Sequence, residues 1–61
     1  MTETEFRDVL QEILVLDMEE SPSQITTVIS FADLQLLTPN TGLVIRTRDR
    51  SEFQITIVKT K

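Results

Sequence analysis

The sequence has no cysteine and no histidine among its 61 residues. Without cysteine no disulfide can form, and without either residue the usual ligands of a zinc site are missing. The same two absences remove the commonest general base and the thiolate nucleophile. Asp17, Glu19 and Glu20 lie close together, but they lack the spacing and the glycine of a calcium loop. We therefore expect no enzyme, no cofactor and no metal centre.

Long apolar runs are also absent, since the longest has four residues, too few to cross a bilayer. The first residues, Met-Thr-Glu-Thr-Glu, are acidic and unlike a secretory signal. Together with the lack of cysteine, this predicts a cytoplasmic protein, encoded by a cell or by a phage or mobile element.

Glycine and proline are scarce, with one glycine and two prolines. Pro22 predicts an extended Ser21 and a connector over residues 17–23. Pro39, Asn40 and Gly42 predict a turn over residues 38–42, in which Asn40 and Gly42 tolerate positive φ.

Between these breaks, residues 3–16 show the apolar spacing of an amphipathic helix. Thr2 and Glu5 predict a capping box at its start. The face expected to cover a sheet consists of Phe6, Val9, Leu10, Ile13 and Leu14.

Residues 24–31 alternate and are rich in β-branched side chains, which predicts a strand. Its inward row would be Ile25, Thr27, Ile29 and Phe31. Residues 30–37 allow two interpretations: one helical turn capped by Ser30, which we favour, or a bulged continuation of the strand.

Residues 43–58 alternate twice around Asp49-Arg50-Ser51 and predict a β-hairpin with that three-residue loop. Because the loop contains no glycine, we expect strain at Arg50 or Ser51. Opposite charges would meet at Arg48 and Glu52. The predicted register pairs Thr47 with Phe53, Ile45 with Ile55, and Leu43 with Ile57.

Residues 1–61 therefore predict a single α+β domain in α-β-β-β order. One N-terminal amphipathic helix packs on a three-stranded antiparallel sheet, with a short helical turn between the first two strands. A chain of this size has a small core, so association with a second copy or another protein would help to stabilise it.

Charge is unevenly spread along the chain, whose net charge is −4. Residues 1–20 hold seven acids and one arginine, giving −6, whereas residues 21–61 hold three acids and five bases, giving +2. Such asymmetry favours head-to-tail contacts or a charged partner.

The predicted function is a non-catalytic protein-interaction or adaptor module, with a protein partner or a homodimer as its complex. The alternative is a charge-driven inhibitor or regulator that contacts nucleic acid or a nucleic-acid-binding protein. The acidic net charge and the lack of Tyr and Trp argue against nucleic acid itself. The expected contact residues lie on the outer sheet face and the hairpin: Val44, Arg46, Arg48, Arg50, Gln54, Thr56 and Val58.

Overall fold

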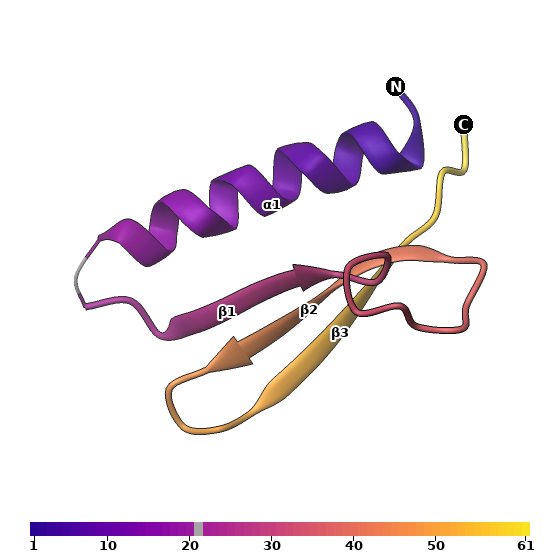
Figure 1. The fold of residues 1–61 in the computed structure, drawn as a ribbon. Coiled ribbons are helices and arrows are strands. Elements are labelled where there is room, and N and C mark those ends of the chain that lie inside the picture. Colours follow the sequence, from indigo (N-terminus) through magenta and orange to yellow (C-terminus); the bar gives the residue numbers. More distant parts are fainter. Residues whose placement is uncertain (21) are drawn as a thin grey trace.

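The computed structural model describes residues 1–20 and 22–61, so the extended conformation expected at Ser21 lies outside the described residues. Helix α1 (Glu3–Glu19) is followed by strands β1 (Ile25–Ser30), β2 (Thr41–Thr47) and β3 (Glu52–Ile57). The strands form one antiparallel sheet in the order β1-β2-β3, and α1 packs against it (Figure 1). The predicted fold class is confirmed.

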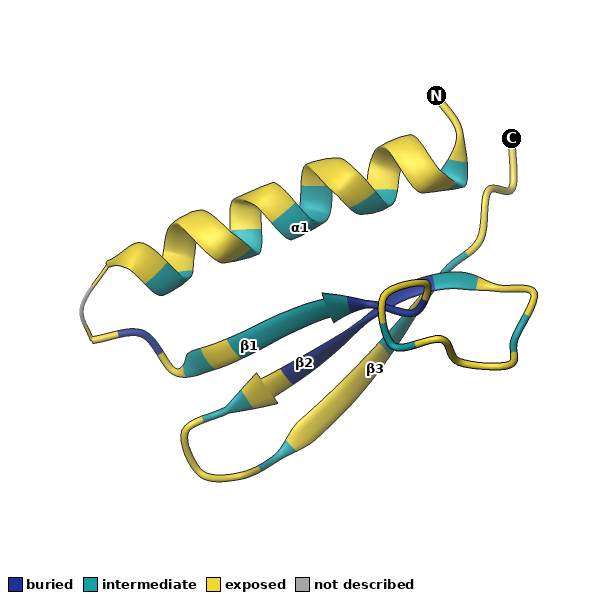
Figure 2. Ribbon diagram, viewed as in Figure 1, coloured by how far each residue is buried: buried dark blue, intermediate teal, exposed yellow. Residues whose placement is uncertain are grey.

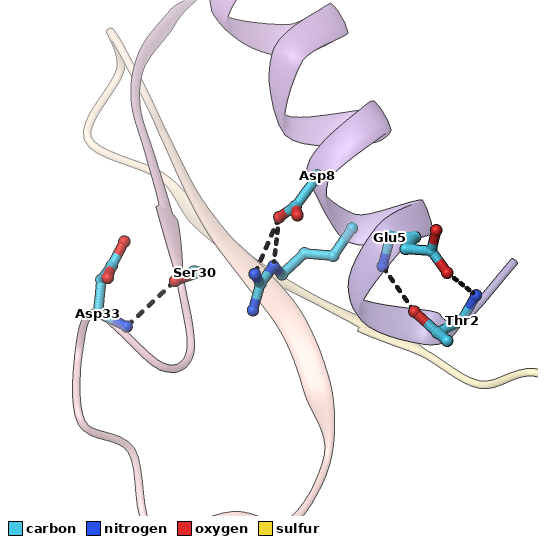
Figure 3. A network of polar contacts seen from close by, with 6 residues as sticks. Thr2, Glu5, Asp8, Ser30 and Asp33 are labelled. Atoms are coloured by element: carbon cyan, nitrogen blue, oxygen red, sulfur yellow. Dashed lines mark hydrogen bonds and ion pairs between the residues drawn. The ribbon is translucent and has the colours of Figure 1, made fainter.

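Helix α1 begins at the predicted capping box. The Glu5 N–H donates to Thr2 Oγ1 at 3.0 Å, and the Thr2 N–H donates to Glu5 Oε1 at 2.9 Å (Figure 3). The helix continues three residues beyond the predicted end at residue 16 and closes with the Glu20 N–H on the Asp17 carbonyl. The extra turn adds Met18 to a half-buried row with Leu10 and Leu14, spaced four residues apart.

The predicted covering face of the helix is only partly right. Leu10 and Leu14 are half-buried, but Phe6, Val9 and Ile13 are exposed. Because consecutive helical residues lie about 100° apart, the Leu10–Leu14–Met18 row leaves Ile13 on the flank of the helix. Most of the helix surface is correspondingly exposed in Figure 2.

The hairpin register also differs from the prediction. Ile45 pairs with Phe53, Leu43 with Ile55, and Thr41 with Ile57. This is two residues away from the predicted register, so each side chain stays on its predicted face. Four residues, 48–51, connect the two strands in place of the predicted three. Asp49 holds this loop by accepting hydrogen bonds from Thr47 Oγ1 at 2.5 Å and from the Ser51 N–H at 3.1 Å.

The opposite-charge pair changes with the register. Arg46 Nε lies 2.8 Å from Glu52 Oε1, in place of the predicted contact between Arg48 and Glu52. Arg48 leaves the ladder and bonds to the segment before β1 instead: its N–H donates to the Gln24 carbonyl at 2.9 Å, and its Nε donates to the Ser23 carbonyl.

A β-bulge reverses which side chains of β1 point to the inner face of the sheet. The register shifts between Ile25 and Thr27, where Thr26 Oγ1 donates to the Arg46 carbonyl at 3.2 Å. Beyond the bulge Val28 pairs with Ile45, and Ile29 pairs with Val44. The prediction that Ile29 shares a face with Ile45 is therefore wrong, and Val28 takes that place because one extra residue reverses the alternation.

The two sheet faces follow from the pairing, since cross-strand partners share a face. The apolar residues of the inner face are Ile25, Val28, Leu43, Ile45, Phe53, Ile55 and Ile57, and the outer face includes Ile29, Val44, Arg46, Glu52, Gln54 and Thr56. Helix α1 contacts β1 and β2, and Phe6 shares a hollow with Ile57 of the inner face. The helix therefore covers the inner face, mainly over the first two strands.

Residues 31–40 connect β1 to β2 and begin with the predicted helical turn. The Leu34 N–H donates to the Ser30 carbonyl, and Ser30 Oγ caps the Asp33 N–H at 3.1 Å (Figure 3). The turn ends with a Schellman pattern, in which Gln35 has φ 55° and the Leu36 N–H donates to the Phe31 carbonyl. The alternative of a continued strand is wrong.

Gly42 belongs to β2 and does not have positive φ, so its predicted role in a turn is wrong. Its small size is required instead by close packing. A Cβ built at this position would overlap the Ile55 carbonyl oxygen and lie 2.5 Å from Cε2 of Phe31. The Phe31 ring thus packs directly on the backbone of β2.

The buried apolar core is small and lies around the middle strand. Among the described residues its members are Phe31, Leu43, Val44 and Ile45. Figure 2 shows this burial concentrated in β2, whereas β3 is mostly exposed. One helix over two strands leaves the third strand with much less cover.

The hairpin loop contains strain that a single substitution can remove. Arg50 has φ 70°, a left-handed conformation that costs an L-residue roughly 1–2 kcal/mol. We expect Arg50→Gly to raise the free energy of unfolding by about 0.5–1 kcal/mol, after allowing for the greater freedom of glycine in the unfolded chain. Urea denaturation measures the change. Arg50→Ala is the control, because it removes the charge but retains Cβ, and a gain as large in that variant would contradict the backbone explanation.

Candidate interaction surface

Four exposed apolar side chains lie in a row on α1. Phe6, Val9, Ile13 and Leu16 are 47%, 42%, 58% and 54% exposed. Their spacing of three, four and three residues is that of the apolar seam in paired helices. We call these four residues the helix stripe.

Strand β3 carries a second apolar row on the inner face, which is only partly covered. Phe53 is 56% exposed, and Ile55 and Ile57 are half-buried. Their exposure follows from the position of the helix over β1 and β2. We call Phe53, Ile55 and Ile57 the β3 row.

Two hollows show on which side of the helix the stripe lies. Phe6 lines a hollow of about 390 Å³ together with Ile57 and Val58, beyond the end of β3. Thr4 and Arg7 instead line a hollow of about 240 Å³ that also includes Phe31 and Ala32, at the end of β1. The Phe6 side of α1 therefore faces β3, and Phe6 borders the same part of the inner face as Ile57. Ile13 lies on the same flank of the helix, whereas Val9 and Leu16 continue the stripe toward the side that faces away from the sheet.

The seven contact residues expected from the sequence do not form one surface. Val44 is only 2% exposed, between its cross-strand partners Ile29 and Gln54, so its place on an exposed face is corrected. Arg46 is paired with Glu52, and Arg48 bonds to the backbone before β1. Neither side chain extends freely from the hairpin.

The other four lie in three separate places. Arg50 is exposed at the hairpin loop. Gln54 and Thr56 line a hollow of about 360 Å³ with Leu36 and Leu37, on the outer face. Val58 is exposed beyond β3, in the same hollow as Phe6.

Several acidic side chains have hydrogen-bond or ion-pair partners within the chain. Glu3 Oε2 accepts the Lys59 N–H at 2.7 Å, which ties the two ends of the described chain together. Asp8 pairs with Arg7 at 2.9 Å (Figure 3), and Asp17 accepts the Ser23 hydroxyl at 3.0 Å. The hydroxyl of Thr47 and then the backbone of Ser51, both donating to Asp49, lower the pKa of that carboxyl.

Metal ligands do not gather in the described part of the chain. Residues 1–20 and 22–61 contain no cluster of three or more His, Cys, Asp or Glu side chains arranged to hold a metal ion. Over the same residues, no helix combines the length and the apolar character needed to span a bilayer.

Comparisons with known proteins add no assignment: no family model matches the chain, and no significant match is found among curated proteins or solved structures.

The sequence did not predict the helix stripe, because Phe6, Val9 and Ile13 were expected on the covered face of the helix. A signal was present, because the helix carries more apolar residues than one face can bury.

Proposed function

We propose that this protein is a non-catalytic protein-interaction module that acts in the cytoplasm and docks through the helix stripe and the β3 row. The observation that carries this proposal is the balance of apolar residues. Four hydrophobic residues are buried among those described, whereas ten large ones are exposed, and five of these lie in the helix stripe and at Phe53. Contiguous apolar surface of this kind is typical of protein contacts.

Charge supports this choice over the alternative of a charge-driven inhibitor or regulator. Arg46 and Arg48 both have partners within the chain, which weakens a basic strip on the hairpin. Arg7 and Asp8 likewise neutralise each other on the helix. A charge-driven complex would weaken steeply with added salt, whereas apolar docking would not.

Site-specific photo-crosslinking in the cells that make the protein tests the proposal. We expect a benzophenone amino acid at position 13 or 53 to give adducts with the same protein. Positions 26 and 37 are the controls, because Thr26 and Leu37 are exposed but lie outside the helix stripe and the β3 row. Equal yields from all four positions, or no adduct from 13 and 53, would contradict the proposed surface.

A further inference from the structure

The uncovered part of the inner face has room for one more helix. Helix α1 lies mainly over β1 and β2 and leaves the β3 row only partly covered, with Phe53 exposed. Phe6 borders this space and the rest of the helix stripe lies on the adjoining exposed side of α1, so a helix packed along this flank would contact residues of both rows. A helix packed on one strand pair and beside another helix is an ordinary two-layer arrangement.

The exposed apolar area is the right size for a dimer. Phe6, Val9, Ile13, Leu16 and Phe53 are each about half exposed. Together they present on the order of 450 Å² of apolar area, taking usual side-chain areas. A standard interface buries about 800 Å² on each partner, of which about 65% is apolar in homodimers, or roughly 500 Å².

The charges of the two halves of the chain are complementary. Residues 1–20, which include α1, carry −6, and residues 21–61, which form the sheet, carry +2. Two helices brought together along their whole length would repel. A helix of one copy placed on the inner face of another avoids this repulsion, because the paired residues of that face include no acidic side chain.

Resting on the proposed function, we propose that the partner is a second copy of this chain, docked reciprocally. The helix stripe of each copy covers the β3 row of the other. The contact is isologous: both copies use the same patch, which consists of the helix stripe and the β3 row. No patch is left free, so the assembly stops at a dimer. The exposed apolar side chains of the helix become buried between the two sheets.

Sedimentation of the purified wild-type chain is the first test and needs no substitution. We expect a concentration-dependent shift from about 7 kDa to twice that mass between about 1 µM and 1 mM. A chain that remains monomeric at 1 mM would overturn the proposal.

Two variants test the reciprocal arrangement. By symmetry each substitution acts twice, so we expect Ile13→Lys and Phe53→Glu each to weaken the dimer by about 100-fold or more. Both sites are exposed in a single chain, so the fold should persist, which circular dichroism checks. Leu37→Lys and Leu37→Glu introduce the same charges outside the surface and should leave the dimer unchanged.

Mixing the Ile13→Lys and Phe53→Glu chains distinguishes the modes of docking. A mixed pair has one intact contact, and its other contact places the introduced lysine against the introduced glutamate, so we expect dimers to return on mixing. Pairing of stripe with stripe would instead leave the Phe53→Glu chain as dimeric as the wild type before any mixing, because Phe53 would then lie outside the contact. That result would overturn the reciprocal mode.

The outcomes also separate this inference from the proposed function. A monomeric chain that gives an adduct of another mass from positions 13 and 53 in cells would overturn the dimer and leave the interaction module standing. A monomeric chain without any adduct from those positions would overturn both.

Discussion

Replacing Gly42 by alanine is expected to unfold the protein. The added Cβ would overlap the carbonyl oxygen of Ile55 and lie 2.5 Å and 2.7 Å from two ring carbons of Phe31. Neither neighbour can withdraw easily, since one is backbone of the sheet and the other is a buried ring. Overpacking of this severity costs about 3 kcal/mol or more, and a 61-residue domain has roughly 3–9 kcal/mol of total stability.

Circular dichroism with urea denaturation measures this effect. The control is Thr56→Ala, because Thr56 is the exposed cross-strand partner of Gly42 on the outer face. In a Phe31→Leu background the penalty should fall, since the outer ring carbons are gone, although the contact with the Ile55 oxygen remains. A Gly42→Ala variant as stable as the wild type would contradict the packing of Phe31 on β2.

The second large effect is expected for Val44→Asp. Val44 is 2% exposed in the middle strand, so its replacement leaves a carboxylate without solvent in the core. The cost is at least about 4 kcal/mol, whether the group stays charged or takes up a proton. We expect loss of the cooperative unfolding transition.

Val58→Asp is the matched control for Val44→Asp. Val58 is 66% exposed beyond the end of β3, so the same chemical change should alter the free energy of unfolding by less than about 0.5 kcal/mol. The alternation of the sequence places both valines on the outer face, and only their burial distinguishes them. Equal stability of the two variants would contradict the buried position of Val44.

Local signals in the sequence predicted the elements well. Three of these signals depend on neighbours within a few residues: the capping box at Thr2 and Glu5, the turn capped by Ser30, and the reversal of the chain around Asp49. Such contacts form wherever the side chains have the right spacing. Positive φ at Arg50 was likewise one of two expected sites of strain.

The errors lie where distant segments decide the outcome. The bulge between Ile25 and Thr27 forms against β2, and it reverses the parity of β1. The hairpin register depends on whether Arg46 or Arg48 meets Glu52, and Arg48 is drawn away by the backbone of Ser23 and Gln24. Periodicity alone does not contain these tertiary contacts.

The candidate surface was predicted least well, for the same reason. The apolar residues of α1 occupy more than one face, and only the position of the helix over β1 and β2 decides which of them are covered. Val44 shows the converse, since this residue of the central strand points to the outer face and is still buried, between its partners Ile29 on β1 and Gln54 on β3. Charge and alternation identified the hairpin, but they could not indicate which surface stays open.

Cysteine labelling tests most directly whether the helix stripe is exposed in the monomer and covered in the dimer. The protein has no cysteine, so Ile13→Cys and Leu14→Cys each introduce a single thiol. At nanomolar protein we expect the thiol at position 13 to react with a maleimide nearly as fast as in an unfolded peptide, and the thiol at position 14 distinctly more slowly. At high concentration the thiol at position 13 should become protected as the dimer forms. Faster reaction at position 14 than at position 13, or a rate at position 13 that does not change with concentration, would contradict the account.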